Sequence, residues 1–147
     1  MPILTLTNTL STAKFNRAPD VAIDDTFDSG TDSWNAISAD VTHDSTNGYL
    51  AVAATSTGGY AYKSFTTVNG VVYFWSVNLM ATGIGGGHVM IGTSRGDTTH
   101  GNIATDTAGY YSGTFTASGT TTFIHLQSDT DGITNKWDNV LVETKDN

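Results

Sequence analysis

Short runs of strand-forming residues, separated by turn residues about every 8 to 12 positions, are the feature that most constrains this chain. The dipeptides at 47–48, 69–70 and 131–132 are Asn-Gly or Asp-Gly, which tolerate the positive φ angles of tight turns. Composition points the same way, because 26 threonines and a single glutamate leave few good helix formers among 147 residues. The chain is therefore predicted to be an all-β antiparallel sandwich or barrel.

Alternation of apolar and polar residues locates the expected strands. In the run 121–128, Ile124 and Leu126 are predicted to face the core, opposite His125 and Gln127. Leu50 is predicted to face the core in the same way. The predicted strands are 22–27, 34–42, 49–54, 60–66, 71–81, 88–93, 110–117, 121–128 and 136–143.

The first twenty residues differ in charge from the rest, and they define a separate segment. Residues 1–19 carry a charge of +2 and no acid, whereas the remainder carries −10. We predict an extended N-terminal arm over residues 1–20, ending in a turn at 18–20, and a single domain over 21–147. The arm is expected to add as a strand to a neighbouring subunit. The residues expected to carry this assembly are Ile3, Leu4, Leu6, Lys14 and Arg17.

Charge and composition exclude several classes of partner. Six Lys and Arg residues against 14 acids argue against nucleic acid, which needs a clustered basic surface. The longest apolar stretch, at 71–75, is far too short to cross a bilayer, so we expect no membrane insertion. The start of the chain lacks the basic and apolar segments of a signal peptide, which predicts synthesis in the cytoplasm without one.

Five segments resemble, in the same order, the carbohydrate-binding-module-like jelly rolls, which are also called galactose-binding-like domains. The first segment, at 27–34, begins with Phe-Asp and ends with Trp, and the last, at 137–142, reads Trp-Asp-Asn-Val-Leu-Val. The others are at 48–52, 63–73 and 111–117. Such domains occur in glycosidases and in bacteriophage virion proteins. The resemblance implies an antiparallel two-sheet jelly-roll β-sandwich over most of the domain.

No catalytic constellation stands out. Residues 92–96 match the G-x-S-x-G pattern, but that pattern requires a helix after Ser94, and the sequence 97–101 is unsuited to one. A single glutamate, Glu143, offers no Glu pair for glycoside hydrolysis, and there is no cysteine nucleophile. We therefore predict that the protein is not an enzyme.

The resemblance also implies one structural calcium ion between the opening and closing segments. Its ligands here would be Asp28 and Asp138, with Asp25 as a further candidate. Calcium prefers hard oxygen ligands, which this Asp-rich chain supplies. The alternative is that these aspartates cap turns through their own backbone.

Aromatic side chains on the solvent face of a sheet are the residues with which such modules usually bind sugars. Side chains alternate between the two faces of a strand, and the candidates that this alternation places on the solvent face are Tyr60, Tyr62, Trp75, His125 and Gln127. The alternative is that the large aromatics among them pack in the sandwich interior.

Two functions from different classes follow. The first is a non-catalytic virion structural protein, a phage capsid decoration or tail component, made in the host cytoplasm and attached through its arm. Its expected partners are other virion proteins and further copies of itself, with a homotrimer preferred. The alternative is a carbohydrate-binding module or adhesin that recognises a cell-surface glycan.

Overall fold

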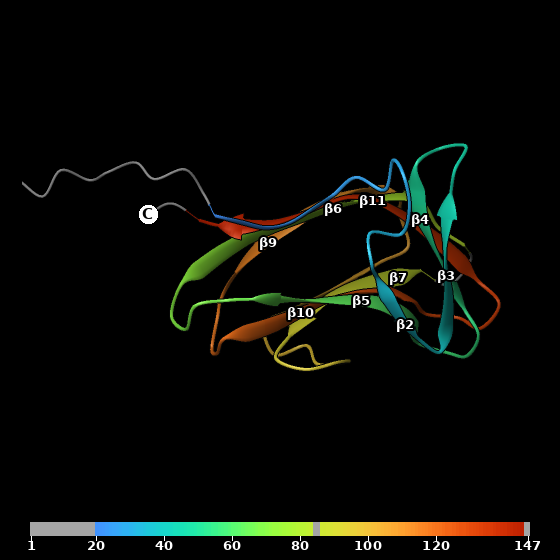
Figure 1. The fold of residues 1–147 in the computed structure, drawn as a ribbon. Coiled ribbons are helices and arrows are strands. Elements are labelled where there is room, and N and C mark those ends of the chain that lie inside the picture. Colours follow the sequence, from blue (N-terminus) through green and yellow to red (C-terminus); the bar gives the residue numbers. More distant parts are fainter. Residues whose placement is uncertain (1–19, 84–85, 146–147) are drawn as a thin grey trace, which may run out of the picture.

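A computed structural model describes residues 20–83 and 86–145, which form two antiparallel sheets packed face to face (Figure 1). The six-stranded sheet has the order β3 (Ala39–Asp44), β4 (Tyr49–Ala54), β11 (Thr134–Thr144), β6 (Val72–Ala81) and β9 (Gly109–Thr116), and β1 (Val21–Asp25) also pairs with β11. The five-stranded sheet has the order β2 (Asn35–Ile37), β5 (Gly59–Thr66), β10 (Thr121–Ser128), β7 (Gly87–Gly92) and β8 (Gly101–Thr105). The prediction of an all-β, antiparallel two-sheet jelly-roll β-sandwich is confirmed.

The core lies between the two sheets and follows the predicted alternation. Leu50 of β4 and Ile124 and Leu126 of β10 are fully buried, as expected. Trp137 of β11 is the largest fully buried side chain. Burial of these apolar side chains is the main force that holds the two sheets together.

The predicted strand at 34–42 is wrong, because the chain turns a corner at Ser38. Ser38 has a φ of 51°, so β2 and β3 belong to different sheets. The Ser38 carbonyl accepts a hydrogen bond from the Thr55 backbone N–H at 2.8 Å. A Cβ on Gly59 would lie 1.9 Å from that same carbonyl oxygen, so only glycine fits at this crossing.

The sequence pattern did not predict β8, which forms the outer edge of the five-stranded sheet. Its only large apolar residue, Ile103, is partly buried against the core. An edge strand buries little surface, so its sequence shows weak alternation. Pairing of β8 with β7 fixes both ends of the connecting loop at residues 93–100.

The arm expected at residues 1–20 lies outside the described residues, except for Asp20. The Asp20 N–H donates to Thr144 Oγ1 at 2.8 Å, and the Thr144 N–H donates to the Asp20 carbonyl at 3.0 Å. Asp20 therefore extends the pairing of β1 with β11, and the turn predicted at 18–20 does not include it. Within residues 20–83 and 86–145, no helix is long and apolar enough to cross a membrane.

Candidate glycan-binding face

The side of the five-stranded sheet that points away from the core carries most of the predicted sugar-binding residues. We call this side the outer face; Tyr60 and Tyr62 of β5 lie there, opposite Gln127 and His125 of β10. The intervening residues of β10 point into the core. The sequence therefore placed these four side chains on the correct side of the sheet.

Aromatic rings on the outer face form a connected cluster. The rings of Tyr60 and Tyr62 meet edge to face at 6.2 Å between centroids. His125 lies 5.3 Å from the ring of Tyr60 and is stacked with Phe123 at 6.3 Å. Tyr60, Tyr62 and Phe123 are half-buried, so each keeps part of its surface available for contact with a ligand.

His125 is on this face but fully buried, because the loop 93–100 covers it. The Gly96 N–H donates to His125 Nε2 at 2.9 Å, and His125 Nδ1 lies 3.2 Å from the Met90 carbonyl. These contacts define a neutral imidazole that donates from Nδ1 and accepts at Nε2. Burial lowers the pKa of His125, against smaller opposing effects of the Met90 hydrogen bond and the Asp97 charge. The prediction of an exposed His125 in contact with sugar is therefore wrong.

Asp97 holds the covering loop in its shape. Its carboxylate accepts hydrogen bonds from the backbone N–H and the hydroxyl of both Thr93 and Thr99, at 2.6–3.0 Å. These bonds, the Thr99 hydroxyl first, keep the pKa of Asp97 far below its usual value. The strand β8 follows the loop, so Ser94 of the G-x-S-x-G pattern is not placed before a helix.

The loop also brings a cation to the outer face. The guanidinium carbon of Arg95 lies 5.9 Å from the centroid of the Tyr62 ring. Gly96, with a φ of +75°, approaches Tyr60 so closely that a Cβ would lie 3.3 Å from the tyrosine hydroxyl. Sequence reasoning missed Arg95, although it is the only lysine or arginine between Lys63 and Lys136.

A cluster of polar side chains, the polar cluster, lies beside the aromatic rings. His88 Nδ1 forms a hydrogen bond with Asn102 Oδ1 at 2.8 Å, and His88 Nε2 lies 3.1 Å from Asp129 Oδ2. Gln127 Nε2 donates to Asp129 Oδ1 at 2.7 Å. Of these four residues the sequence pointed only to Gln127. Planar amide and carboxylate groups next to aromatic rings suit a ligand that has both hydroxyl groups and apolar ring faces.

Trp75 does not belong to the outer face. It lies in β6 of the other sheet, is 4% exposed and packs in the core. Its cross-strand neighbour is Gly113, where a Cβ would come within 2.9 Å of the indole nitrogen. The parity prediction failed because β6 is apolar on both faces over its first half, which hides which side faces solvent.

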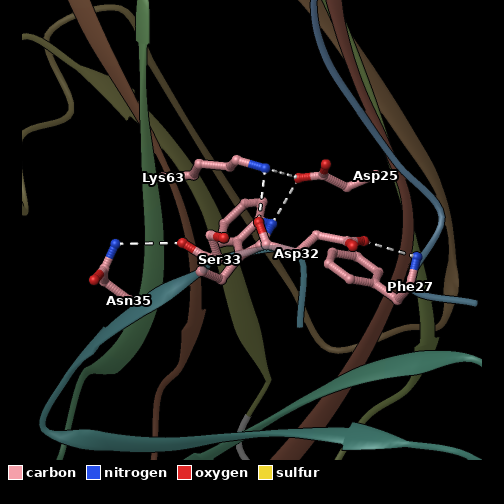
Figure 2. A network of polar contacts seen from close by, with 7 residues as sticks. Asp25, Phe27, Asp32, Ser33, Asn35 and Lys63 are labelled. Carbon is pink, nitrogen blue, oxygen red and sulfur yellow. Dashed lines mark hydrogen bonds and ion pairs between the residues drawn. The ribbon is translucent and has the colours of Figure 1, made fainter. Parts of the chain in front are cut away.

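Asp25, one of the predicted calcium ligands, forms an ion pair with Lys63 (Figure 2). Lys63 Nζ donates to Asp25 Oδ2 at 2.7 Å and to the Asp32 carbonyl at 2.9 Å. Trp34 Nε1 donates to the same Asp25 oxygen at 2.8 Å. The ammonium group therefore joins the opening segment to β5, and Asp25 as a calcium ligand stays a prediction.

Asp28 and Asp138 lie close enough to influence each other. Burial raises the pKa of Asp138, and the charge of Asp28 raises it further, against the opposing Asn139 backbone hydrogen bond. Asp28 Oδ2 accepts from the Thr26 hydroxyl at 2.8 Å. Over the residues that the structure describes, no three acidic or histidine side chains form a metal-binding group. The three-aspartate set is therefore not assembled, and calcium on Asp28, Asp138 and backbone oxygens stays a prediction.

Calcium at this pair is expected to raise the melting temperature by about 5–10 °C, because a hundredfold excess over Kd stabilises by about 2.7 kcal/mol. Asp138→Asn is expected to lose this response. In chelator the variant is expected to be slightly more stable than wild type at neutral pH. Folding raises the pKa of the Asp138 carboxyl, so ionisation of this group lowers the free energy of unfolding of the wild type as the pH rises above 3.8. Scanning calorimetry tests this, with the exposed Asp131→Asn as control. Identical melts with calcium and with chelator would contradict it.

Comparisons place this fold among known structures. No family model matches the chain, and no curated protein matches it. Solved structures do match, including the CBM22-1 xylan-binding domain of Paenibacillus barcinonensis Xyn10C, at 18% identity and a TM-score of 0.60 over 87% of this chain and 96% of that one. The N-terminal cellulose-binding domain of Cellulomonas fimi β-1,4-glucanase C matches at 21% identity and a TM-score of 0.62, over 83% and 95%.

A third match is the Clostridium thermocellum xylanase 10B structure, which contains CBM22-1 and GH10 modules with xylohexaose, at 20% identity and a TM-score of 0.61. The match covers 86% of this chain and 29% of that one, so this chain spans less than a third of that structure. At these identities the likeness shows the fold alone. The chain is a jelly-roll β-sandwich, the fold that these carbohydrate-binding modules also have.

Proposed function

We propose that this chain is a non-catalytic glycan-binding module and that the outer face of its five-stranded sheet holds the ligand. The observation that carries the proposal is the Tyr60–Tyr62 pair lying directly beside the polar cluster. The tyrosine rings offer apolar faces for sugar rings, and Gln127 and Asp129 offer partners for hydroxyl groups. The fold shared with xylan-binding and cellulose-binding domains supports the same proposal.

Weak, reversible binding is expected, because the polar groups of the outer face already bond to one another. Affinity electrophoresis in gels that contain soluble xylan, β-glucan or hydroxyethylcellulose tests the proposal. Retardation in at least one gel, relative to a gel without polysaccharide, is the expected result. Unchanged mobility in a wider panel of plant, bacterial and animal glycans would overturn it.

The role first predicted, a phage capsid decoration or tail component, has no support in the comparisons. A place in the virion, a homotrimer and attachment to other virion proteins stay predictions. A glycan-binding module and a particle-bound protein are compatible, because a displayed sandwich can hold glycans on its outer face. Glycan binding is the function that the described residues favour.

Acidification is expected to loosen the loop over the outer face. A proton on His125 Nε2 would place an N–H against the Gly96 N–H, and the hydrogen bond between them would be lost. Because the pKa of folded His125 lies below its usual 6.5, the native state binds fewer protons than the unfolded chain below that pH. Stability should therefore fall as pH drops below 6.5, by at most about 1.4 kcal/mol per pH unit. Urea unfolding at several pH values measures this, and a slope unchanged by His125→Gln would contradict it.

A further inference from the structure

A groove of about 720 Å³ opens at the end of the sandwich where the described chain begins. It lies between β1 and β5, and its apolar lining includes Val21, Phe65, Val68 and Tyr73. Val21 and Val68 are 54% and 61% exposed, so the groove presents apolar side chains to solvent. Figure 1 shows the start of β1 beside the end of β11 at this end of the molecule.

Both walls of the groove are open strand edges. Among the described strands, β1 pairs only with β11, which leaves its second edge without a partner strand. On the other wall, β2 pairs with β5 only over 60–62, so none of the described strands pairs with residues 63–66 on that side. Open edges of this kind accept an added strand, and the apolar floor between them gives it side-chain contacts.

The N-terminal arm has a suitable sequence. In residues 3–7, Leu4 and Leu6 fall on one side of an extended strand, with Thr5 and Thr7 on the other. Leu4 and Leu6 can therefore fill the groove while the threonines face solvent. Residues 1–19 carry +2 against −10 for the rest of the chain, which favours contact between an arm and an acidic domain.

We propose that this groove binds residues 3–7 of a second copy of the chain by strand addition. The start of β1 argues for a second copy: Asp20 is still paired with Thr144, so an extended chain before it is expected to point away from its own groove. Ala18 precedes Pro19 and is thereby biased to extended backbone, which favours such a path. The 12 residues between Thr7 and Asp20 can span up to about 40 Å, enough to reach a neighbouring domain.

Mass measurement by light scattering at micromolar concentration tests the proposal on the full chain. Wild type is expected to self-associate, and the double variant Leu4→Asp/Leu6→Asp is expected to be monomeric. Thr5→Asp/Thr7→Asp adds the same charge on the opposite side of the strand and should stay associated. On the groove, Val68→Glu should be monomeric, whereas Met80→Glu, at an exposed apolar residue outside the groove, should not.

Mixing the two monomeric variants gives the decisive result. Leu4→Asp/Leu6→Asp keeps an intact groove and Val68→Glu keeps an intact arm, so together they should form a one-to-one heterodimer in native mass spectrometry. Far-ultraviolet circular dichroism shows that each variant is folded. A monomeric wild type, for example with the arm in its own groove, would overturn the proposal. So would self-association that both pairs of variants retain, or failure of the folded variants to form the heterodimer.

Discussion

Replacing Tyr62 with alanine is expected to weaken glycan binding about 30-fold while the domain stays folded. A tyrosine at the centre of a binding surface typically contributes about 2 kcal/mol or more, and 1.4 kcal/mol corresponds to a factor of ten. Tyr62 is at that centre, because it touches Tyr60, Phe123 and Arg95. Calorimetric titration with an oligosaccharide of the retarding polysaccharide measures the loss.

The matched control is Tyr110→Ala. Tyr110 is 62% exposed, but it lies on β9 of the other sheet, so its removal should leave the affinity unchanged. Equal losses in both variants would mean that binding does not depend on the outer face. An unaffected Tyr62→Ala would remove this tyrosine from the proposed site.

Replacing Lys63 with methionine is expected to lower the free energy of unfolding by about 2–3 kcal/mol. The change leaves the Asp25 carboxylate, whose side chain is 11% exposed, without its ammonium partner. Breaking a buried ion pair typically costs about 3–5 kcal/mol, and the 25% exposure of the Lys63 side chain reduces that here. Urea unfolding followed by tryptophan fluorescence gives the value, because Trp34 bonds to the same carboxylate.

Two further variants test whether the unpaired Asp25 charge causes this loss of stability. Adding Asp25→Asn to Lys63→Met removes the unpaired carboxylate and should restore part of the lost stability. Lys136→Met breaks the Lys136–Asp44 pair, which is more exposed on the lysine side, and should cost less than Lys63→Met. Equal losses for Lys63→Met and Lys136→Met, with no recovery in the double variant, would contradict a structural role for the Asp25 network.

The fold was predictable from the sequence wherever one face of a strand is apolar and the other polar. In β10 the alternation of Ile124 and Leu126 with His125 and Gln127 placed every side chain on its observed side. The same reasoning failed at Trp75, where both sides of the strand are apolar. It also failed at Ser38, because one residue with a positive φ at a corner between two strands does not change the alternation of apolar and polar residues.

The candidate site was predictable only in its strand residues. Tyr60, Tyr62 and Gln127 were found by parity, but the cover over His125 comes from a loop whose position depends on the unpredicted β8. Asp25 and Lys63 are 38 residues apart in the chain, and nothing in either segment indicates that they meet. Contacts of this kind follow from the three-dimensional arrangement of the sheets, which local pattern does not encode.

Chemical-shift mapping during titration with an oligosaccharide of the retarding polysaccharide locates the surface that binds glycan. We expect the backbone amide signals of Tyr60, Tyr62, Phe123 and Gln127 to shift together with those of the loop 93–100. Signals of β9 and of the groove between β1 and β5 should stay in place. Shifts confined to β9 or to that groove, or no shift at millimolar oligosaccharide across the panel, would contradict glycan binding on the outer face.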